Sequence, residues 1–569
     1  MLLTEITEHN KQYKNKDLPS LNLLILRDIT LDPIEHFYRY YSNLMGYHAA
    51  ITWGNYNTIY QDSYNLSSDY DFIFIFPKLE MMTENLTYKF SRMRTEDIQL
   101  EISNIIFFFK GVFSNIRQSS NAVILWHSFE VPLYPNLGIF DTISENSQLE
   151  IINNINSLTK GLAYEFKGVY CVDTNLCQSR LGNFFYDRRM WYSSKMPYSL
   201  DGLKEIANED FKYIRALKGK NKKCLVLDCD NTLWGGIVGE DGIEKIQLDE
   251  KFINFHREII NLYYRGIIIA LVSKNNEDDV WEVFRKRNDM TLKKEHIATS
   301  QINWDDKATN IKIIAENLNI GLDSIVFADD SVFECNLVKS LIPEIETLHM
   351  NKPMDYSIIL ASCGLFDTVS LSDEDKKRGQ MYKEDLQRKK IKSDKTNLLE
   401  YYTSLEMNLE ISKVTNLEVG RASQLTQRTN QFNFTTRRYS EEDIKHFIED
   451  PSHDIYYVKA RDNIGDLGIV GLIILRYEDE SAFIDSFLMS CRALGRTIED
   501  AFLMNVILQL ERTGIKRIIG LYSETKKNIQ VKDYYERYGF INNKNCWVLY
   551  TDNLPKKDFS YFKNIEMRE

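Results

Sequence analysis

The sequence predicts a multidomain α/β protein, and three observations support that prediction. The chain has 569 residues, enough for three to four domains at roughly 150 residues each. Short apolar runs such as LNLLIL (21–26), DFIFIF (71–76) and CLVLD (224–228) alternate with helix-length segments, as in parallel sheets covered by helices. Hydrophobic residues make up 43% of the chain and charged residues 27%, so each domain is able to bury a core.

We expect three domains and one connector. Residues 1–218 alternate buried strands with helices and predict a parallel α/β domain. Residues 219–370 repeat that pattern and place polar residues at the carboxyl ends of strands, where such sheets bind ligands. Residues 371–404 are charged with both signs, which favours a solvated helix between domains. Residues 405–569 mix helices with antiparallel-looking strands and predict an α+β domain.

The composition excludes several classes of function. The chain has 70 Lys and Arg against 82 Asp and Glu, a formal net charge of −12, and no basic block, so we expect no nucleic-acid partner and no docking on anionic lipid. A local basic pocket for a phosphorylated metabolite remains compatible with this balance. We find no signal-peptide pattern and no apolar run near the ~20 residues of a membrane helix. The eight cysteines form no CxxC pairs, so we expect a cytoplasmic protein with reduced thiols.

Two carboxylates end the strand that opens the second domain. Asp228 and Asp230 are two residues apart, so in an extended chain both point to the same side. Carboxylate oxygens suit Mg²⁺, and one carboxylate is able to attack phosphorus while the other handles the proton of the leaving group. Cys229 lies between them and alternation turns it to the opposite face.

Three further elements follow in order along the second domain. Ser273 closes the next apolar strand and is followed by Lys274, Lys307 comes after a loop, and Asp329 with Asp330 ends the run SIVFADD. This succession, over about 220–350, resembles the haloacid dehalogenase (HAD) superfamily of phosphotransferases. The resemblance implies that Asp228 is the nucleophile and Asp230 the general acid/base. It also implies that phosphate is bound by Ser273, Lys274 and Lys307. The implied Mg²⁺ ligands are Asp228, Asp230, Asp329 and Asp330.

The spacing also predicts an open site. Only about 20 residues separate Asp230 from the next helix, and about one helix and one strand lie between Ser273 and Lys307. Neither gap is long enough for a large cap domain, and an uncapped site does not exclude water by itself. We therefore expect a flanking domain or a macromolecular partner to cover it.

A narrower resemblance depends on longer motifs. The run LDCDNTLWGG (227–236), with VSKNN (272–276) and FADDSVFE (327–334), resembles the FkbH-like subgroup of HAD proteins. That resemblance implies an enzyme that takes 1,3-bisphosphoglycerate, removes phosphate, and loads a glyceryl unit on the phosphopantetheine of an acyl carrier protein in polyketide biosynthesis.

The last domain contains two motifs that resemble GNAT acyltransferases. SCRALGR (490–496) follows an apolar strand and precedes a helix, so Arg492, Gly495 and Arg496 are expected to meet the phosphate of phosphopantetheine or of CoA. YYERYGF (534–540) is similar to the closing helix-turn-strand of these enzymes. The segment QRTNQFN (427–433) resembles an FkbH-like polar segment beside the acyl-transfer site, and we assign it no chemical step.

Two cysteines are candidates for a covalent acyl carrier. Cys491 has Arg492 beside it and a helix start just after it, and cationic surroundings favour the thiolate that acts as nucleophile. It lies where the resemblance to GNAT enzymes places the acyl-pantetheine, and core packing is the alternative. Cys229 is the second candidate, with a buried core residue as its alternative.

The first domain resembles the SGNH hydrolases in its strand pattern and in LRDIT (26–30). That family needs a Ser after the first strand and an Asp-x-x-His motif near the end, and here Asp187 is followed three residues later by Met190. A Ser without this base is not activated. We therefore predict a non-catalytic docking or lid domain. A group of basic and aromatic residues follows Asp187, namely Arg188, Arg189, Trp191 and Tyr192. This group predicts either a phosphate site or a packed helix turn.

The leading hypothesis is a glyceryl transferase-like phosphatase and acyltransferase. An alternative is a HAD phosphatase fused to a GNAT N-acetyltransferase that uses acetyl-CoA on a sugar or amino compound. A third hypothesis, a non-enzymatic scaffold, conflicts with the intact residues Asp228, Asp230, Ser273, Lys307 and Asp329.

Overall fold

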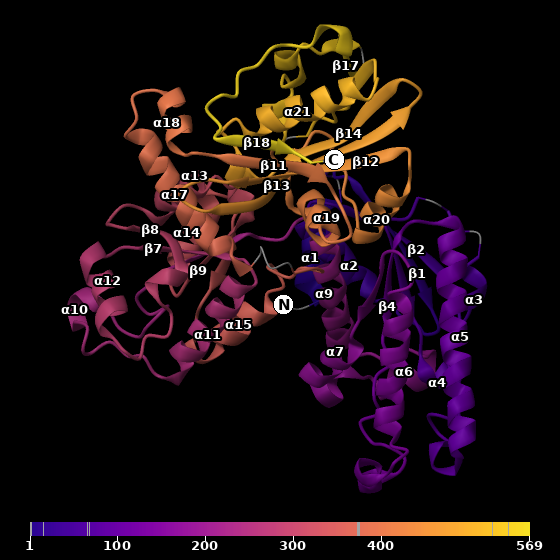
Figure 1. The fold of residues 1–569 in the computed structure, drawn as a ribbon. Helices are drawn as coiled ribbons and strands as arrows, with labels where there is room; N and C mark the ends of the chain where they lie inside the picture. The colour runs from indigo at the N-terminus through magenta and orange to yellow at the C-terminus, as the bar shows by residue number, and fades with distance from the viewer. Residues whose placement is uncertain are drawn as a thin grey trace. The chain divides into compact units, whose positions relative to one another are not determined.

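The computed structural model describes residues 3–14, 16–64, 66–67, 69–371, 376–525, 527–543 and 546–568. The chain divides into two compact units, Met1–Arg215 and Ala216–Glu569 (Figure 1). The second unit contains both the predicted HAD-like domain and the predicted C-terminal domain. Across the described ranges, no helix is at once long enough and apolar enough to cross a membrane.

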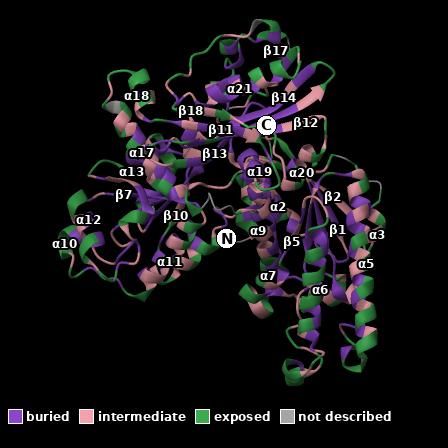
Figure 2. Ribbon diagram, viewed as in Figure 1, coloured by how far each residue is buried: buried purple, intermediate pink, exposed green. Residues whose placement is uncertain are grey.

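The first unit is built on a parallel sheet with strand order β2-β1-β3-β4-β5, as predicted. Its strands are β1 (Ser20–Arg27), β2 (His48–Tyr56), β3 (Phe72–Phe76), β4 (Val123–His127) and β5 (Val169–Val172). Its main helices are α1 (Leu3–Tyr13), α2 (Ile34–Leu44), α5 (Thr95–Ser119), α6 (Gln148–Ala163), α7 (Thr174–Leu181), α8 (Arg188–Ser194) and α9 (Leu200–Leu217). Every residue of β3 is buried, because helices cover both faces of the sheet (Figure 2).

His127, at the end of β4, has a structural role. Its Nε2 atom lies 2.8 Å from Oδ1 of the buried Asp210, and its Nδ1 atom lies 3.1 Å from the Ile75 carbonyl. The ring also stacks on Phe76 at 3.6 Å between centroids. These contacts fill the hydrogen-bonding capacity of the imidazole, so it is not available as a catalytic base.

Asp28, just after β1, is a buried carboxyl whose charge destabilises the fold. Burial raises the pKa of Asp28 to about 7, although the backbone N–H of Lys78 donates to it at 3.4 Å. An unfolded Asp has a pKa of about 3.9, so the folded state holds the proton more tightly, and the free energy of unfolding falls as the pH rises from about 4 to about 7. We expect Asp28→Asn to be more stable than the wild type by up to about 4 kcal/mol at pH 8, and nearly equal at pH 4.

Calorimetric unfolding at the two pH values measures this difference. The matched control is Asp32→Asn, because Asp32 is exposed and pairs with Arg27 at 2.7 Å. An equal gain at both pH values would show that folding does not raise the pKa of Asp28, contrary to this account.

The HAD-like domain has a second parallel sheet, with strand order β10-β9-β6-β7-β8. Its strands are β6 (Cys224–Leu227), β7 (Ile268–Ser273), β8 (Ile297–Ile302), β9 (Ile325–Asp329) and β10 (Glu346–His349). Its helices are α10 (Val238–Asp241), α11 (Glu250–Tyr264), α12 (Glu277–Lys286), α13 (Lys307–Leu318), α14 (Val332–Leu341) and α15 (Tyr356–Ser362). Between Asp230 and α11 the only helix is the four-residue α10, and α12 and β8 fill the second gap, so the predicted absence of a large cap is confirmed.

The C-terminal domain has an eight-stranded mixed sheet, with strand order β16-β17-β15-β14-β13-β12-β11-β18. Its strands are β11 (Asn408–Lys413), β12 (His453–Arg461), β13 (Asp466–Glu478), β14 (Ser481–Met489), β15 (Arg517–Gly520), β16 (Ile541–Asn543), β17 (Cys546–Tyr550) and β18 (Asn564–Met567). Its main helices are α19 (Val419–Arg428), α20 (Glu441–Glu449) and α21 (Ile498–Arg512). The parallel pairing of β14 with β15 covers only 481–484 of β14, so the remainder of β14 leaves its neighbour.

The charged connector forms helices, as predicted, but one face of its first helix is buried, so it is only partly solvated. It contains α17 (Arg378–Ser393) and α18 (Leu398–Ser404), while residues 372–375 lie outside the described ranges. Tyr382 packs into the core on one face of the HAD-like sheet, and Arg388 forms a buried ion pair with Asp462 at 2.6 Å. One face of α17 thus packs against the HAD-like domain through Tyr382 and pairs with the C-terminal domain through Arg388.

Arg388→Ala is expected to destabilise the second unit by about 3–5 kcal/mol, because it leaves the Asp462 carboxylate buried without its partner. Urea unfolding measures the loss. The matched control is Arg568→Ala, because its half-exposed pair with Glu410 should contribute little to stability. Equal effects of the two substitutions would contradict the bridging role of α17.

Candidate functional site

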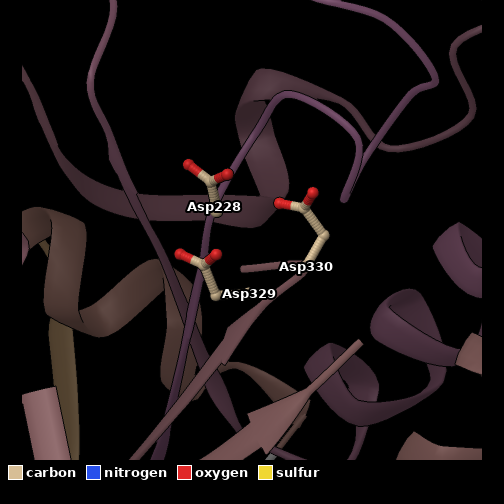
Figure 3. A group of neighbouring side chains, drawn as sticks. All are labelled: Asp228, Asp329 and Asp330. Carbon is tan, nitrogen blue, oxygen red and sulfur yellow. The ribbon is translucent and has the colours of Figure 1, made fainter. Parts of the chain in front are cut away.

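Three carboxylates converge at the carboxyl ends of β6 and β9. Asp228 follows β6, Asp329 ends β9, and Asp330 comes next. These strands pair in parallel, so their carboxyl ends meet, and one oxygen of each acid lies within 4.8 Å of the other two (Figure 3). A set of three carboxylates suits a hard cation such as Mg²⁺, which prefers oxygen ligands.

The side chain of Asp230 is not one of these three converging carboxylates. It accepts hydrogen bonds from Asn275 Nδ2 at 2.9 Å, Trp234 Nε1 at 2.8 Å and the Val238 N–H at 3.1 Å. The structure thus brings together three of the four predicted metal-binding acids and holds Asp230 by separate contacts. A carboxylate held in this way has a fixed orientation, which is what proton transfer requires.

Ser273 and Lys307 both contact Asp228. Ser273 Oγ donates to Asp228 Oδ1 at 2.9 Å, while Lys307 Nζ lies 2.9 Å from that oxygen and 2.6 Å from Asp329 Oδ2. Lys274, the third predicted phosphate-binding residue, instead pairs with Glu334 at 2.7 Å. The structure therefore places two of these three side chains against Asp228.

Asn275 is a member of the site to which sequence reasoning assigned no role. Its Nδ2 atom lies 2.9 Å from Asp230 Oδ2 and 3.3 Å from Ser273 Oγ. The two-residue spacing from Ser273 was the available signal, because alternate residues leaving a strand point to one side.

The site holds more negative than positive charge. Burial, followed by repulsion from Asp228, raises the pKa of Asp329 to about 6, although Lys307 acts in the opposite direction. Burial alone would lower the pKa of Lys307, but the attraction of Asp228 and Asp329 outweighs it and raises that pKa. One ammonium group thus faces three acids, and a divalent cation would offset the remaining charge.

Cys229 lies in the core on the other face of β6, as alternation predicts. Its side chain is fully buried among apolar residues such as Leu227 and Trp234. Burial and the nearby Asp228 raise the pKa of the Cys229 thiol, so the thiol stays protonated and unreactive.

Cys491 lies in a cavity of about 260 Å³ between the HAD-like and C-terminal domains. The half-buried thiol is 3.3 Å from Gln431 Oε1, and its backbone carbonyl accepts a hydrogen bond from Asn319. Asn430 and Gln431, from the segment QRTNQFN, line the cavity with Lys223. The structure thus places part of the segment QRTNQFN beside Cys491, the residue predicted to carry the acyl group.

The carboxylates and Cys491 lie at opposite ends of the HAD-like sheet. Lys223 and Ser324, which line the Cys491 cavity, come just before β6 and β9, whereas Asp228 follows β6. Five residues of extended chain, from 223 to 228, span roughly 16 Å at about 3.3 Å per residue. A molecule bound at the carboxylates therefore does not reach the thiol directly.

The two arginines that are predicted to bind pantetheine form a hydrogen bond and an ion pair within the second unit. Arg492 donates to the Leu467 carbonyl at 2.7 Å, Arg496 pairs with Asp385 of α17 at 3.1 Å, and each is 3% exposed. Gly495 is exposed, with a φ of +76° that favours glycine. Their part in pantetheine binding stays a prediction.

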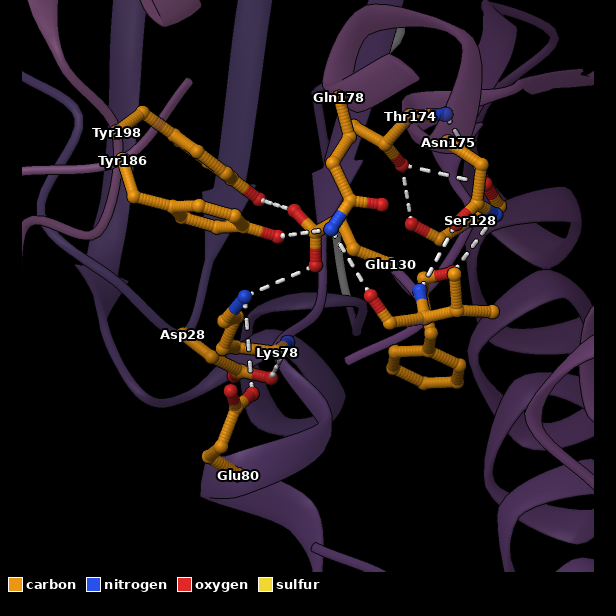
Figure 4. Close-up of polar contacts among 12 residues, drawn as sticks. Asp28, Lys78, Glu80, Ser128, Glu130, Thr174, Asn175, Gln178, Tyr186 and Tyr198 are labelled. Carbon is orange, nitrogen blue, oxygen red and sulfur yellow. Dashed lines mark hydrogen bonds and ion pairs between the residues drawn. The ribbon is translucent and has the colours of Figure 1, made fainter. Parts of the chain in front are cut away.

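The first unit has a cavity of about 480 Å³ beyond the carboxyl ends of its strands. Arg188 and Trp191 line it together with Lys78, whose ammonium lies 2.9 Å from Glu130 (Figure 4). Asp187 caps α8 by accepting the Met190 N–H at 3.0 Å. Arg189 and the exposed Tyr192 are not among the residues that line this cavity.

Comparison with known proteins identifies similar structures. No protein-family model matches the chain, and no curated protein sequence matches it. A crystal structure of the N-terminal part of BF1531 from Bacteroides fragilis, described as containing a phosphatase domain complexed with Mg, is 28% identical. It covers 65% of this chain and 100% of its own, with a TM-score of 0.58.

Acetyltransferases match over shorter spans. The ribosomal-protein-S18-alanine N-acetyltransferase from Escherichia coli is 14% identical, covers 25% of this chain and 90% of its own, and has a TM-score of 0.20. Rv2747 from Mycobacterium tuberculosis, in complex with CoA and NLQ, is 14% identical over 24% of this chain and 72% of its own, with a TM-score of 0.19. These scores are too low to support an argument about this chain.

Proposed function

We propose that the HAD-like site removes a phosphoryl group from its substrate with the help of Mg²⁺. A carboxylate oxygen of Asp228 attacks phosphorus, and the bond from phosphorus to the substrate oxygen breaks. Asp230 gives that oxygen a proton and then accepts one from the water that releases phosphate from Asp228. Ser273 and Lys307 hold the phosphoryl oxygens in this sequence of steps.

Asp228, Asp329 and Asp330 would hold the metal ion. Bound Mg²⁺ would offset the charge that develops on the transferred group. The single observation that best supports this function is the set of contacts around Asp228. Ser273 Oγ and Lys307 Nζ each lie 2.9 Å from Asp228 Oδ1, and Lys307 Nζ lies 2.6 Å from Asp329 Oδ2. The Mg-complexed phosphatase domain of BF1531 is consistent with it.

The proposal extends to acyl transfer in the C-terminal domain. Its substrate is a phosphorylated three-carbon acyl donor such as 1,3-bisphosphoglycerate. The sulfur of Cys491 bonds to the acyl carbon, the bond from that carbon to the phosphate oxygen breaks, and inorganic phosphate leaves with the thiol proton. The phosphopantetheine thiol of an acyl carrier protein then takes the glyceryl unit and releases Cys491 as a thiol. The half-buried Cys491 in a cavity beside Gln431 supports this step. The roughly 16 Å between the two ends of the sheet requires the phosphorylated compound to move between sites.

An incubation with Mg²⁺, 1,3-bisphosphoglycerate and a phosphopantetheinylated carrier tests the acyl transfer. The expected result is phosphate release together with a carrier heavier by one glyceryl group. Phosphate release with an unchanged carrier mass would contradict it. Turnover of acetyl-CoA on an amino compound would then favour the N-acetyltransferase alternative, in which the C-terminal domain uses acetyl-CoA.

A further inference from the structure

The cavity of the first unit lies where the topology of its sheet favours ligand binding. In the strand order β2-β1-β3-β4-β5, the direction of winding reverses between β1 and β3. Parallel sheets bind ligands at such a point, beyond the carboxyl ends of the strands. Lys78, two residues after β3, lines the cavity. The volume of about 480 Å³ is that of a small-molecule site, which is typically roughly 300–1,000 Å³.

A buried ion pair forms part of the cavity wall. Lys78 Nζ lies 2.9 Å from Glu130, and each of the two side chains is 5% exposed. Tyr198 donates a hydrogen bond to the Glu130 carboxylate, and Glu80 lies 3.7 Å from Lys78 Nζ (Figure 4). Burial alone would lower the pKa of Lys78, but the attraction of Glu130 and Glu80 outweighs it and raises that pKa. One ammonium group thus faces two carboxylates, and Glu80 is the more weakly held of the two.

A positive charge lines the same cavity. Arg188, in the first turn of α8, forms no ion pair with any residue that the structure describes. The Tyr186 hydroxyl accepts a hydrogen bond from Gln178 Nε2 at 3.0 Å, and no atom of the described ranges accepts its proton. A guanidinium and a hydroxyl are therefore open to an anionic group. Since Arg188 and Glu80 do not pair with each other, one ligand with both charges would satisfy them together.

A carboxylate suits this cavity better than a phosphate. Phosphate groups commonly bind at helix N-termini, where free N–H groups point outward. At α7, the Asp173 side chain already accepts the N–H of Asn175, and at α8 the Asp187 side chain accepts that of Met190. These negative caps occupy the N–H groups that a phosphate would use, and they repel a dianion.

The remaining wall is largely apolar and aromatic. It consists of Leu133, Tyr134, Trp191 and Pro197, together with the amide of Asn183. Tyr134 is 68% exposed, so a large aromatic ring is available to an incoming apolar group. The ligand therefore combines an apolar body with an anionic and a cationic group.

We infer that this cavity binds a free α-amino acid with an aromatic or large apolar side chain. Arg188 and Tyr186 hold its carboxylate, because a guanidinium group donates two parallel hydrogen bonds to a carboxylate. Glu80 holds its ammonium group, and its side chain packs against Tyr134 and Trp191. Each end of a peptide offers only one of the two charged groups on its terminal residue, so blocked amino acids distinguish a peptide from a free amino acid.

A ligand-observed NMR titration of the full chain in EDTA tests the site, with L-phenylalanine as the probe. L-Phenylalaninamide lacks the carboxylate and stands for the start of a peptide, whereas N-acetyl-L-phenylalanine lacks the ammonium group and stands for its end. We expect L-phenylalanine to bind at least about tenfold more tightly than either blocked compound, since each loses one charged hydrogen-bonding partner. Glucose and AMP should bind more weakly still.

Two variants assign the two charges to their residues. Arg188→Gln should weaken binding of L-phenylalanine and of N-acetyl-L-phenylalanine, and leave L-phenylalaninamide unchanged. Glu80→Gln should weaken binding of L-phenylalanine and of L-phenylalaninamide, and leave N-acetyl-L-phenylalanine unchanged. The matched controls are Arg189→Gln, at an exposed residue that does not line the cavity, and Glu84→Gln, whose exposed side chain pairs with Lys89 at 2.6 Å. Neither control should change binding.

Three results would overturn the inference. The first is absence of L-phenylalanine binding to the wild type. The second is binding that both Arg188→Gln and Glu80→Gln leave unchanged. The third is tighter binding of glucose, AMP or a blocked compound, which would assign the cavity to a sugar, a nucleotide or a peptide end. The assay involves neither Mg²⁺ nor phosphate release, so its outcome is independent of the phosphatase proposal.

Discussion

Asp228→Asn is expected to lower phosphate release from an acyl phosphate or a phosphate ester at the HAD-like site by at least about a thousandfold. The amide is a poor nucleophile, and it lacks the negative charge of the carboxylate that Ser273 and Lys307 contact at 2.9 Å. Initial rates with saturating Mg²⁺, and with EDTA in place of Mg²⁺, measure the effect. Removal of the metal should produce a loss of similar size.

The matched control for this substitution is Asp249→Asn. Asp249 is a half-exposed acid of the same domain, and it pairs with Lys251 at 2.9 Å, outside the site. Its phosphatase rate should stay within about twofold of the wild type. A variant Asp228→Asn with substantial activity would assign the nucleophile to another group.

Cys491→Ala is expected to reduce loading of the carrier by at least about a hundredfold while phosphate release at Asp228 continues. The reason is spatial, because the thiol and the carboxylates lie at opposite ends of β6. The intact mass of the carrier and the rate of phosphate release, measured in the same incubation, separate the two steps.

Cys229→Ala provides the matched control. Its thiol is buried among apolar residues and its pKa is raised, so the substitution should cost some stability and leave carrier loading in place. Full loading by Cys491→Ala would exclude the acyl-enzyme. Loss of loading in Cys229→Ala without loss of fold would transfer the role to that residue.

Much of the carboxylate site could be predicted from the sequence, because its geometry follows from local rules. Parallel strands end at one edge, which is enough to bring Asp228, Ser273 and Asp329 together from three neighbouring strands. The direction of Asp230 could not be predicted, since it depends on Trp234 and Asn275 in a turn with irregular backbone.

The position of Cys491 could not be predicted in the same way. Its cavity forms where the amino ends of β6 and β9 meet a different domain, and no periodicity in the sequence encodes that contact. The connector illustrates the same limit, because its mixed charge resembles a solvated helix although Arg388 is 1% exposed. Lys223 donates a hydrogen bond to the Arg428 carbonyl although 205 positions separate the two residues along the chain, so the sequence gives no sign of their contact.

The most direct test of the central claim, that Asp228 accepts a phosphoryl group beside a bound Mg²⁺, is fluorine NMR with beryllofluoride. This compound binds a carboxylate in the way that a phosphoryl group does. The account predicts signals of bound beryllofluoride in the wild type and in Cys491→Ala when Mg²⁺ is present, and none in Asp228→Asn or in EDTA. The same bound signals in Asp228→Asn would contradict it.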